Sequence, residues 1–574
     1  MQFSWWQEAV FYQIYPRSFA DGNGDGIGDI EGITQSLDYL QWLGVDAIWL
    51  SPHYPSPQID CGYDIADYYG VAPEYGTLED FRRLLREVKR RNMRLILDLV
   101  LNHTSDQHPW FRESRASREN PHRDWYIWRE GRNGGPPNDW YSTFGGSAWT
   151  WDTTTQMYYY HFFFKEQPDL NWRNPEVKKV MFDVVRYWLD MGVDGFRLDA
   201  VGTIFEDPYL PDHGKNYGVD DLYIMLRNAR TQEEQELVRR LFDDLVRFQV
   251  DLPEVHDLMR TLRGVVDEFP DKVLVGESEQ IAFYGNGQDE LHLVFNFPLM
   301  RTRRITPQWV LQNQRERLGA LPPGAWPCNT LGNHDTSRLR SAFGDGVNDE
   351  GLMRVLVALM LTLKGTPFLY NGEEIGMTDY LFTEISRFRD PLALRAYELE
   401  IRLLGASPTE AARHAAAYGR DKCRTPMQWR NAPHAGFCPA HVEPWLPVNP
   451  NYREGINVAD QEQARDSLLR FYHDLLHFRR QCPALRHGDF HPLSGEETEE
   501  YLLFLRSAPG QTCLVGLNFS AQPQEVSLPT EWKGVRCLFS SHSVVGRVLH
   551  QYLKLAPFEV WMGEIINAEK GGFS

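Results

Sequence analysis

The chain has 574 residues, with 59 Lys and Arg against 79 Asp and Glu, which gives a formal net charge of −20. Nucleic acids and anionic membrane surfaces bind proteins through basic faces, so this charge argues against either one as a partner. Hydrophobic residues at 42% and aromatic residues at 13% indicate a globular protein with large cores, and the length predicts several domains.

Cysteine usage points to a reducing compartment. The seven cysteines form no CxxC pair and stand at Cys61, Cys328, Cys423, Cys438, Cys482, Cys513 and Cys537. An odd, scattered set favours free thiols over a disulfide framework or a zinc site. Residues 1–13 lack the basic segment and apolar run of a signal peptide, and no stretch has the apolar length of a membrane helix. We therefore expect a cytoplasmic protein that does not enter a membrane.

The first distinctive segment is DGNGDGIGD at residues 21–29, which follows a predicted strand near residue 10. Side chains with oxygen atoms recur on alternate positions, as the ligands of a Ca²⁺ loop do, at Asp21, Asn23, Asp25 and Asp29. Glycines between them let the backbone curl tightly. The loop is not an EF-hand, because its twelfth position is Gly32 rather than Glu. The alternative is an Asx-rich turn without an ion.

Short apolar runs that end in polar residues recur along the chain and predict strands buried on both faces. They are VFYQIYPRSF near residue 10, then residues 45–52, 94–103, 194–201, 272–279, 291–297, 329–335 and 366–374. Helix-like segments lie between several of them, for example LEDFRRLLREVKRRN and PEVKKVMFDVVRYWLDMG. Eight such units predict a (β/α)₈ barrel, an α/β fold.

Two segments interrupt the alternation. Residues 104–172 are too long for an ordinary loop, so we expect an inserted subdomain after the third strand. Short β-like runs after residue 485 predict a C-terminal antiparallel β domain. The predicted domains are therefore 1–103 (barrel, first part), 104–172 (insertion), 173–484 (barrel, second part) and 485–574 (β domain). Within the barrel, residues 380–465 are rich in Pro and Gly and are expected to form irregular helix and loop.

Polar residues stand where the predicted strands end. They are Asp98, His103, Asp199, Glu277, His334 and Asp335. The active site of a (β/α)₈ barrel gathers at the C-terminal ends of its strands, so we expect these side chains to lie together. A single acid of this kind is usually a helix cap or a surface ion pair, and only the ordered set indicates a site.

Motifs around these residues resemble the α-amylase family, glycoside hydrolase family 13. The similar segments are DLVLNH (98–103), GFRLDAV with Asp199, VGESEQ with Glu277 and LGNHD with Asp335. QPDLNW, CGYDIADY, FGGSAW and RDKCRTPMQW resemble its oligo-1,6-glucosidase and α-glucosidase branch, and the resemblance covers nearly the whole chain in order. It implies a retaining glycosidase with a covalent glycosyl–Asp199 intermediate.

The residues suit that chemistry. Glycoside cleavage needs one carboxylic acid to protonate the leaving oxygen and one carboxylate at the anomeric carbon. Asp199 and Arg197 point the same way from one strand, so we expect the guanidinium to keep the Asp199 nucleophile ionised. Glu277 ends an apolar strand, where desolvation suits a general acid. By resemblance, Asp335 holds the 2- and 3-hydroxyls of the distorted sugar.

The resemblance also implies a shell of sugar-binding residues. Asp60 and Tyr63 would bind and stack on the terminal glucose, and Arg420 would close its far side, which makes the enzyme act on chain ends. His103 and His334 match hydroxyl-binding histidines. Two further candidates, Phe144 and Phe163, could line the pocket wall or belong to the core.

The resemblance extends to the loop at residues 21–29, where the branch has a calcium site. The carbonyl of Ile27 would supply an oxygen between Asp25 and Asp29. We expect a permanent structural Ca²⁺ rather than a sensor, and no cofactor for catalysis. The expected partners are small α-glucosides, and the expected assembly is a monomer or a small homo-oligomer.

The residue after the nucleophile separates linkage preference within the branch, and here it is Ala200. A small side chain leaves room for the second sugar of an α-1,4 link, although one residue sets only a weak preference. Oligo-1,6-glucosidase is an alternative, as is an isomerase or transglucosylase such as trehalose synthase. RTRRI (301–305) replaces the RLDRD of some sucrose isomerases and argues against that activity. A non-catalytic scaffold is disfavoured because all three acids are present and a membrane helix is absent.

Overall fold

The computed structural model describes residues 3–566. Residues 1–2 of the first predicted barrel segment and residues 567–574 of the predicted C-terminal domain lie outside the described residues. Eight parallel strands form one sheet in the order β10-β11-β1-β2-β3-β7-β8-β9. An isolated parallel bridge between Phe295 and Cys328 joins its two edges and closes the barrel. The strands are β1 (Phe11–Ile14), β2 (Ala47–Leu50), β3 (Arg94–Val100), β7 (Gly195–Asp199), β8 (Val273–Gly276), β9 (Leu293–Val294), β10 (Cys328–Thr330) and β11 (Thr366–Tyr370). Seven of them lie within the predicted runs, and β10 begins one residue before its predicted run of 329–335.

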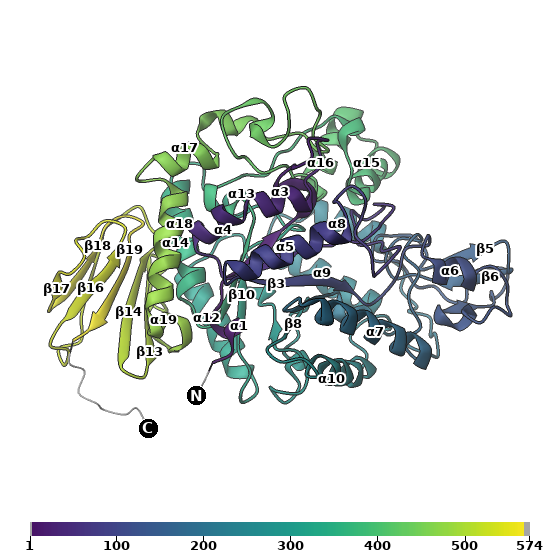
Figure 1. The fold of residues 1–574 in the computed structure, drawn as a ribbon, viewed down its shortest axis with the longest axis horizontal. Helices are drawn as coiled ribbons and strands as arrows, with labels where there is room; N and C mark the ends of the chain where they lie inside the picture. Colours follow the sequence, from purple (N-terminus) through teal and green to yellow (C-terminus); the bar gives the residue numbers. More distant parts are fainter. Residues whose placement is uncertain (1–2, 567–574) are drawn as a thin grey trace.

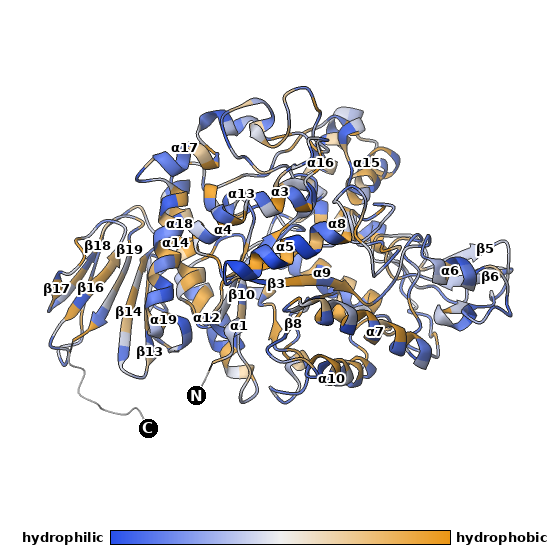
Figure 2. Ribbon diagram, viewed as in Figure 1, coloured by the Kyte–Doolittle hydropathy of each residue, from blue (hydrophilic) through white to orange (hydrophobic). Residues whose placement is uncertain are grey.

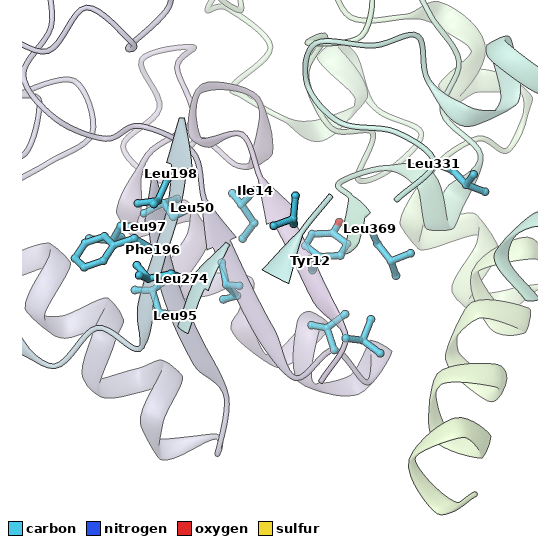
Figure 3. Packing of buried hydrophobic residues seen from close by; sticks show 14 of the residues in the cluster. Tyr12, Ile14, Leu50, Leu95, Leu97, Phe196, Leu198, Leu274, Leu331 and Leu369 are labelled. Atoms are coloured by element: carbon cyan, nitrogen blue, oxygen red, sulfur yellow. The ribbon is translucent and has the colours of Figure 1, made fainter. Parts of the chain in front are cut away.

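Successive residues of each strand face opposite sides of the barrel wall, which explains why the runs are apolar throughout. One set packs in the interior and includes Phe11, Trp49, Ile96, Val275 and Phe368. The other set packs against the helices, and Figure 3 shows it as sticks beside the strands, with Tyr12, Leu97 and Leu198 among those labelled. In Figure 2, most of β3 is correspondingly orange.

Helices surround the strands (Figure 1). The two predicted helical segments form α5 (Leu78–Arg90), capped by the Thr77 hydroxyl, and α7 (Pro175–Met191), capped by the Asn174 side chain. Each cap satisfies a backbone N–H of the first helical turn. Further helices on the barrel and its loops are α1 (Trp5–Glu8), α2 (Pro16–Phe19), α3 (Ile30–Gln35), α4 (Leu37–Leu43), α10 (Glu254–Val266), α11 (Phe297–Met300), α12 (Pro307–Ala320), α13 (Leu339–Phe343), α14 (Asp349–Thr362), α17 (Val458–Gln463), α18 (Leu468–Gln481) and α19 (Pro483–His487).

The insertion after β3 contains α6 (Pro109–Ser114) and a three-stranded antiparallel sheet. The sheet has the order β4 (Trp128–Arg129), β6 (Met157–Tyr160) and β5 (Trp149–Asp152). A bridge between His103 and Asp169 ties the end of the insertion to the end of β3. The insertion therefore returns to the barrel mouth beside a predicted site residue.

Two helical pairs differ from the sequence expectation. The loop after β7 contains α8 (Val219–Asn228) and α9 (Gln232–Val246), which the apolar pattern did not reveal. Residues 380–465, expected to be irregular, contain α15 (Pro391–Leu404) and α16 (Pro408–Tyr418). The two pairs stabilise each other, because Tyr223 and Arg227 of α8 both donate to the buried carboxylate of Glu400 on α15.

The C-terminal domain is antiparallel β structure, as predicted. A six-stranded sheet has the order β12-β13-β14-β19-β16-β17, and β15 pairs with β18. Their bounds are β12 (Asp489–Ser494), β13 (Tyr501–Ala508), β14 (Gln511–Asn518), β15 (Gln524–Ser527), β16 (Val535–Ser540), β17 (Val548–Leu549), β18 (Tyr552–Leu555) and β19 (Val560–Ile565). This domain and the inserted sheet lie at opposite ends of the molecule (Figure 1). No helix within residues 3–566 is long and apolar enough to cross a lipid bilayer.

Gly195 at the start of β7 offers a test of the barrel wall. Its φ of 147° is unusual for other residues, and an added Cβ would lie 2.0 Å from the carbonyl oxygen of Val273 in β8. We expect Gly195→Ala to lower the free energy of unfolding by about 2–4 kcal/mol through overpacking and backbone strain. Urea unfolding measures the change.

Gly264→Ala is the matched control. Gly264 lies within α10, and no atom stands within 4 Å of its added Cβ. Replacing an unstrained helical glycine stabilises by roughly 0.5–1 kcal/mol. Equal effects of the two substitutions would contradict the close approach of β7 and β8.

Candidate active site

One buried guanidinium connects three of the strand-end carboxylates. Arg197 on β7 is 1% exposed, and its Nη1 donates to Asp98 at 2.6 Å and to Asp199 at 2.7 Å. Its Nη2 lies 2.8 Å from Oε2 of Glu277. The register pairs Asp98 of β3 with Arg197 of β7, so neighbouring strands present these groups at the same level. The structure therefore brings Asp199 and Glu277 together, as predicted for the ends of parallel strands.

The protonation of this cluster differs from the sequence expectation. Burial raises the pKa of Asp199 well above its usual range, and the opposing effect of Arg197 is insufficient because Glu277 and Asp98 lie nearby. Burial likewise raises the pKa of Asp98 to about 6. One positive charge serves three carboxylates, so Arg197 alone does not keep Asp199 ionised. Asp98 and Asp199 both bind the same guanidinium nitrogen and raise each other's pKa, so these two groups titrate together.

The backbone after Asp199 also contacts Glu277. The N–H of Ala200 donates to Oε2 of Glu277 at 2.9 Å. Ala200 has φ 40° and ψ 48°, a left-handed conformation that costs a residue with a side chain about 1–3 kcal/mol. The strained turn thus places a backbone donor on the candidate general acid.

Asp335 contacts a different set of charges. Arg424 Nη2 donates to its Oδ1 at 2.5 Å, and Arg420 Nη1 lies 3.6 Å from the same oxygen. Burial favours the neutral acid, but the neighbouring His334, Arg424 and Arg420 hold the pKa of Asp335 well below its usual range. Its side chain is 31% exposed, so an ionised carboxylate faces the opening of the site.

A second ion-pair network closes one side of the site. Arg420 donates to Asp60 at 2.7 Å and to Asp390 at 2.8 Å. Gln167, from the insertion, donates to the other oxygen of Asp60 at 3.2 Å. The guanidinium of Arg420 also lies 5.9 Å from the ring centre of Phe144. Segments from three parts of the chain therefore meet around Asp60.

The two predicted histidines are held inside this shell. Gln13 Nε2 lies 2.7 Å from Nδ1 of His334, and the Tyr63 hydroxyl lies 2.7 Å from its Nε2. The ring of Tyr63 is stacked on that of His334. His103 Nε2 lies 3.2 Å from the carbonyl oxygen of Tyr63. Burial lowers the pKa of His334 to about 3 and that of His103 to about 4, so both rings are neutral.

The two predicted phenylalanines lie next to each other at the insertion. Their ring centres are 5.6 Å apart, and Phe163 contacts His103 edge to face. Both are partly exposed rather than fully buried. The structure thus places Phe144 and Phe163 beside the Asp60 side of the site, which favours the pocket wall over the core.

A cavity of about 420 Å³ opens between Glu277 and Asp335. Its other lining residues are apolar and polar in similar numbers and come from α11, the loop after β10 and α13: Phe297, Met300, Arg301, Leu331, Asn333, Thr336, Ser337, Ala342 and Phe343. Ala200, predicted to shape the second sugar site, is absent from this lining. Ala200 contacts the site through the hydrogen bond from its backbone N–H to Glu277.

The loop at residues 21–29 follows β1 and forms a compact web of hydrogen bonds. Asp21 accepts from Gly24 and Gly26, and Asn23 Nδ2 donates to Asp25 Oδ2 at 3.1 Å. Asp29 caps α3 and accepts the N–H groups of Gly22, Asn23 and Gly32. Nowhere in residues 3–566 are three or more His, Cys, Asp or Glu side chains arranged to hold a metal ion. An ion here would depend on the Asn23 amide and a backbone carbonyl as well.

Sequence reasoning missed three residues that complete these networks: Gln167, Asp390 and Arg424. Gln167 and Arg424 lie inside the motifs QPDLNW and RDKCRTPMQW, so the motifs themselves were the available signal. Asp390 follows no strand and belongs to no quoted motif. Only its contact with Arg420, 30 residues away, reveals it.

Carboxylates gathered at the C-terminal mouth of a (β/α)₈ barrel define the class of barrel glycoside hydrolases. Comparison with known proteins then specifies the family. Residues 13–488 match the model described as alpha amylase, catalytic domain. The chain belongs to the α-amylase family, glycoside hydrolase family 13, and is a glycoside hydrolase. The resemblance read from the motifs is confirmed.

Similar proteins span nearly the whole chain. An oligo-1,6-glucosidase of Parageobacillus thermoglucosidasius is 39% identical over 97% of this chain and 98% of its own length. An α-glucosidase of Pediococcus pentosaceus is 38% identical over 98% and 99%. The crystal structure of the trehalulose synthase MutB from Pseudomonas mesoacidophila MX-45 superposes with a TM-score of 0.86 at 37% identity, covering 99% of this chain and all of that one.

Two buried glutamates lie behind the Asp335 loop. Glu374 accepts the hydroxyls of Tyr12 and Tyr39 at 2.7 and 2.8 Å. Glu373 packs against Gly332, where an added Cβ would lie 2.9 Å from its Oε1. Burial, together with the nearby Glu374, raises the pKa of Glu373 to about 8. Glu373 is therefore a neutral acid at neutral pH.

This pKa makes stability depend on pH. The pKa of Glu373 is near 4.5 in the unfolded chain and about 8 in the folded chain. Between these two pH values the folded chain binds one proton more than the unfolded chain. The contribution of Glu373 to the free energy of unfolding therefore decreases with rising pH, by at most about 1.4 kcal/mol per pH unit. Glu373→Gln removes the titration. We expect the variant to gain stability relative to the parent between pH 5 and 8, as measured by urea unfolding.

Glu499→Gln serves as the control, because the Glu499 side chain is 56% exposed. A Glu373→Gln difference that stays constant across this range would show that Glu373 is already ionised.

Proposed function

We propose that this glycoside hydrolase is a retaining, exo-acting α-glucosidase that releases glucose from the non-reducing end of short α-glucosides. The observation that carries the proposal is the Asp60–Arg420 pair. Arg420 bonds Asp60 and also reaches toward Asp335, so a sugar held by Asp335 has a charged wall on one side and the 420 Å³ cavity on the other. A pocket with one closed side accepts a chain end rather than the middle of a chain.

In this proposal Asp199 is ionised when the substrate is bound: Glu277 protonates the glycosidic oxygen while the Asp199 carboxylate, held by Arg197, bonds to the anomeric carbon. The leaving sugar departs with that proton. A water then gives its proton to Glu277 and its oxygen to the anomeric carbon, which breaks the ester and restores both groups. The shared guanidinium of Arg197 supports this assignment, because it holds both carboxylates close together. Retaining enzymes use a separation of about 5–5.5 Å.

The proposal includes α-1,4 preference and substrates such as maltose and malto-oligosaccharides. The similarity to an α-glucosidase supports it, and the similarity to an oligo-1,6-glucosidase supports the alternative linkage. A second candidate is glucosyl transfer to a sugar, including isomerisation. The structural similarity to a trehalulose synthase and a cavity large enough for a sugar acceptor favour that candidate.

Kinetics on maltose and isomaltose, with every product identified, test this function. We expect glucose release from both, and a higher kcat/KM for maltose. Asp199→Ala should lower kcat by at least about 10⁴-fold, because a missing nucleophile removes the covalent route. A higher kcat/KM for isomaltose would reverse the linkage assignment, and disaccharide products in place of glucose would establish transfer.

We also propose that the 21–29 loop holds a structural Ca²⁺. Its candidate ligands are hard oxygens, and the hydrogen bond from Asn23 Nδ2 to the Asp25 carboxylate places two of the candidate residues side by side. Asp21, Asn23, Asp25 and Asp29, with the Ile27 carbonyl, would hold the ion and pin the loop after β1.

Removal of the ion tests this site. We expect metal analysis after dialysis to find one Ca²⁺ per chain, and a chelator to lower Tm by several degrees, since an ion that binds only the folded state stabilises it. Asp25→Ala should remove both the ion and the chelator effect. If the chain contains no Ca²⁺ and the chelator does not change its Tm, the loop is an Asx-rich turn without an ion.

A cytoplasmic location is proposed as well. All seven cysteines lie within residues 3–566, where they are buried and form no disulfide, as suits a reducing compartment. The proposed assembly is a monomer or a small homo-oligomer.

A further inference from the structure

Arg424 is a cation next to the opening of the site. It is fully buried, whereas the Asp335 carboxylate that it contacts is partly exposed. Its Nε donates to the carbonyl oxygen of His334 at 2.9 Å, and its guanidinium lies 5.3 Å from the ring centre of Tyr15. Nη1 has no hydrogen-bond partner. The residue is thus fixed on two sides and directs Nη2 at Asp335.

The two oxygens of Asp335 have different surroundings. Oδ1 accepts a hydrogen bond from Arg424 Nη2 and lies 3.6 Å from Arg420 Nη1. Oδ2 lies 3.4 Å from Nε2 of His334, and the hydrogen bond from Arg424 goes to Oδ1 and not to Oδ2. A carboxylate held through one oxygen keeps the other free to accept hydroxyl protons. It can accept two of them only while it is ionised.

We propose that Arg424 is a positioning residue for Asp335: it fixes the carboxylate through Oδ1, keeps it ionised and leaves Oδ2 for the hydroxyls of the sugar. This inference rests on the proposed function, in which Asp335 binds the hydroxyls of the distorted sugar ring. Arg424 itself touches no substrate. A lysine could supply the charge but not the planar fork that donates to the His334 carbonyl and to Asp335 together.

Arg338 provides a matched control for losing a buried arginine. It is 2% exposed, donates to the carbonyl oxygens of Asn371 and Thr425, and lies 5.0 Å from the ring centre of Tyr370. It has the same kind of environment as Arg424 but no contact with a site carboxylate. A purely structural role predicts the same kinetic effect for Arg338→Lys and Arg424→Lys.

The test is a double-mutant cycle with Asp335→Asn, using release of 4-nitrophenol from its α-glucoside. We expect Arg424→Lys to lower kcat roughly 100-fold while KM changes less than about threefold, because a preorganised contact is lost in the transition state. In the Asp335→Asn background, Arg424→Lys should lower kcat by less than about threefold, since Arg424 acts through Asp335. Arg338→Lys should leave kcat within about threefold of the parent.

The outcomes separate this inference from the function on which it rests. An undiminished penalty of Arg424→Lys in the Asp335→Asn background would overturn the positioning role while leaving the glucosidase in place. A parent chain that releases no 4-nitrophenol would overturn both. If Arg424→Lys fails to fold, Arg424→Gln goes through the same cycle, because its amide can keep the bond to the His334 carbonyl; additivity in that cycle overturns the proposal equally.

Discussion

The sharing of one guanidinium by three carboxylates is the constraint on which the site depends. Arg197 lies in the middle of the barrel mouth and contacts acids from β3, from its own strand and from the end of β8. Three carboxylates without it would repel one another in a buried space, where removing the partner of a buried charge costs about 3–5 kcal/mol. The barrel strands must therefore hold their register closely, because a shift of one residue would turn Arg197 away from the interior.

The arginines divide the acids of the site into two environments. Asp199 shares a single cation with two other carboxylates, and burial raises its pKa. Asp335 faces two arginines, and its pKa is depressed. Environments that push the pKa values of neighbouring carboxyl groups apart are how active sites assign different tasks to the same functional group.

Much of this arrangement could be predicted from the sequence. Each barrel strand is a short apolar run, and the acids that end these runs had to meet at one mouth because parallel strands end at the same edge. The helices α8 and α9 were missed because their apolar stripes are narrow: α8 depends on contacts with α15, and α9 packs on α8. The protonation of Asp199 was mistaken because Arg197, its neighbour on the strand, is also bound by Asp98, 99 residues earlier. Asp390 and Arg424 act through contacts that span 30 and 89 residues. The local sequence pattern does not indicate contacts between residues that lie so far apart in the chain.

The stacked pair of Tyr63 and His334 has a consequence for recognition. The Tyr63 hydroxyl is bonded to the imidazole and also to Asp98 Oδ2 at 3.2 Å, while Gln13 holds the far side of the imidazole. The aromatic floor therefore cannot tilt without breaking several buried hydrogen bonds at once. In the proposed glucosidase, a sugar that rests on this pair would be selected by the direction of each ring substituent, and an epimer with one inverted hydroxyl would meet a surface that does not adapt to it.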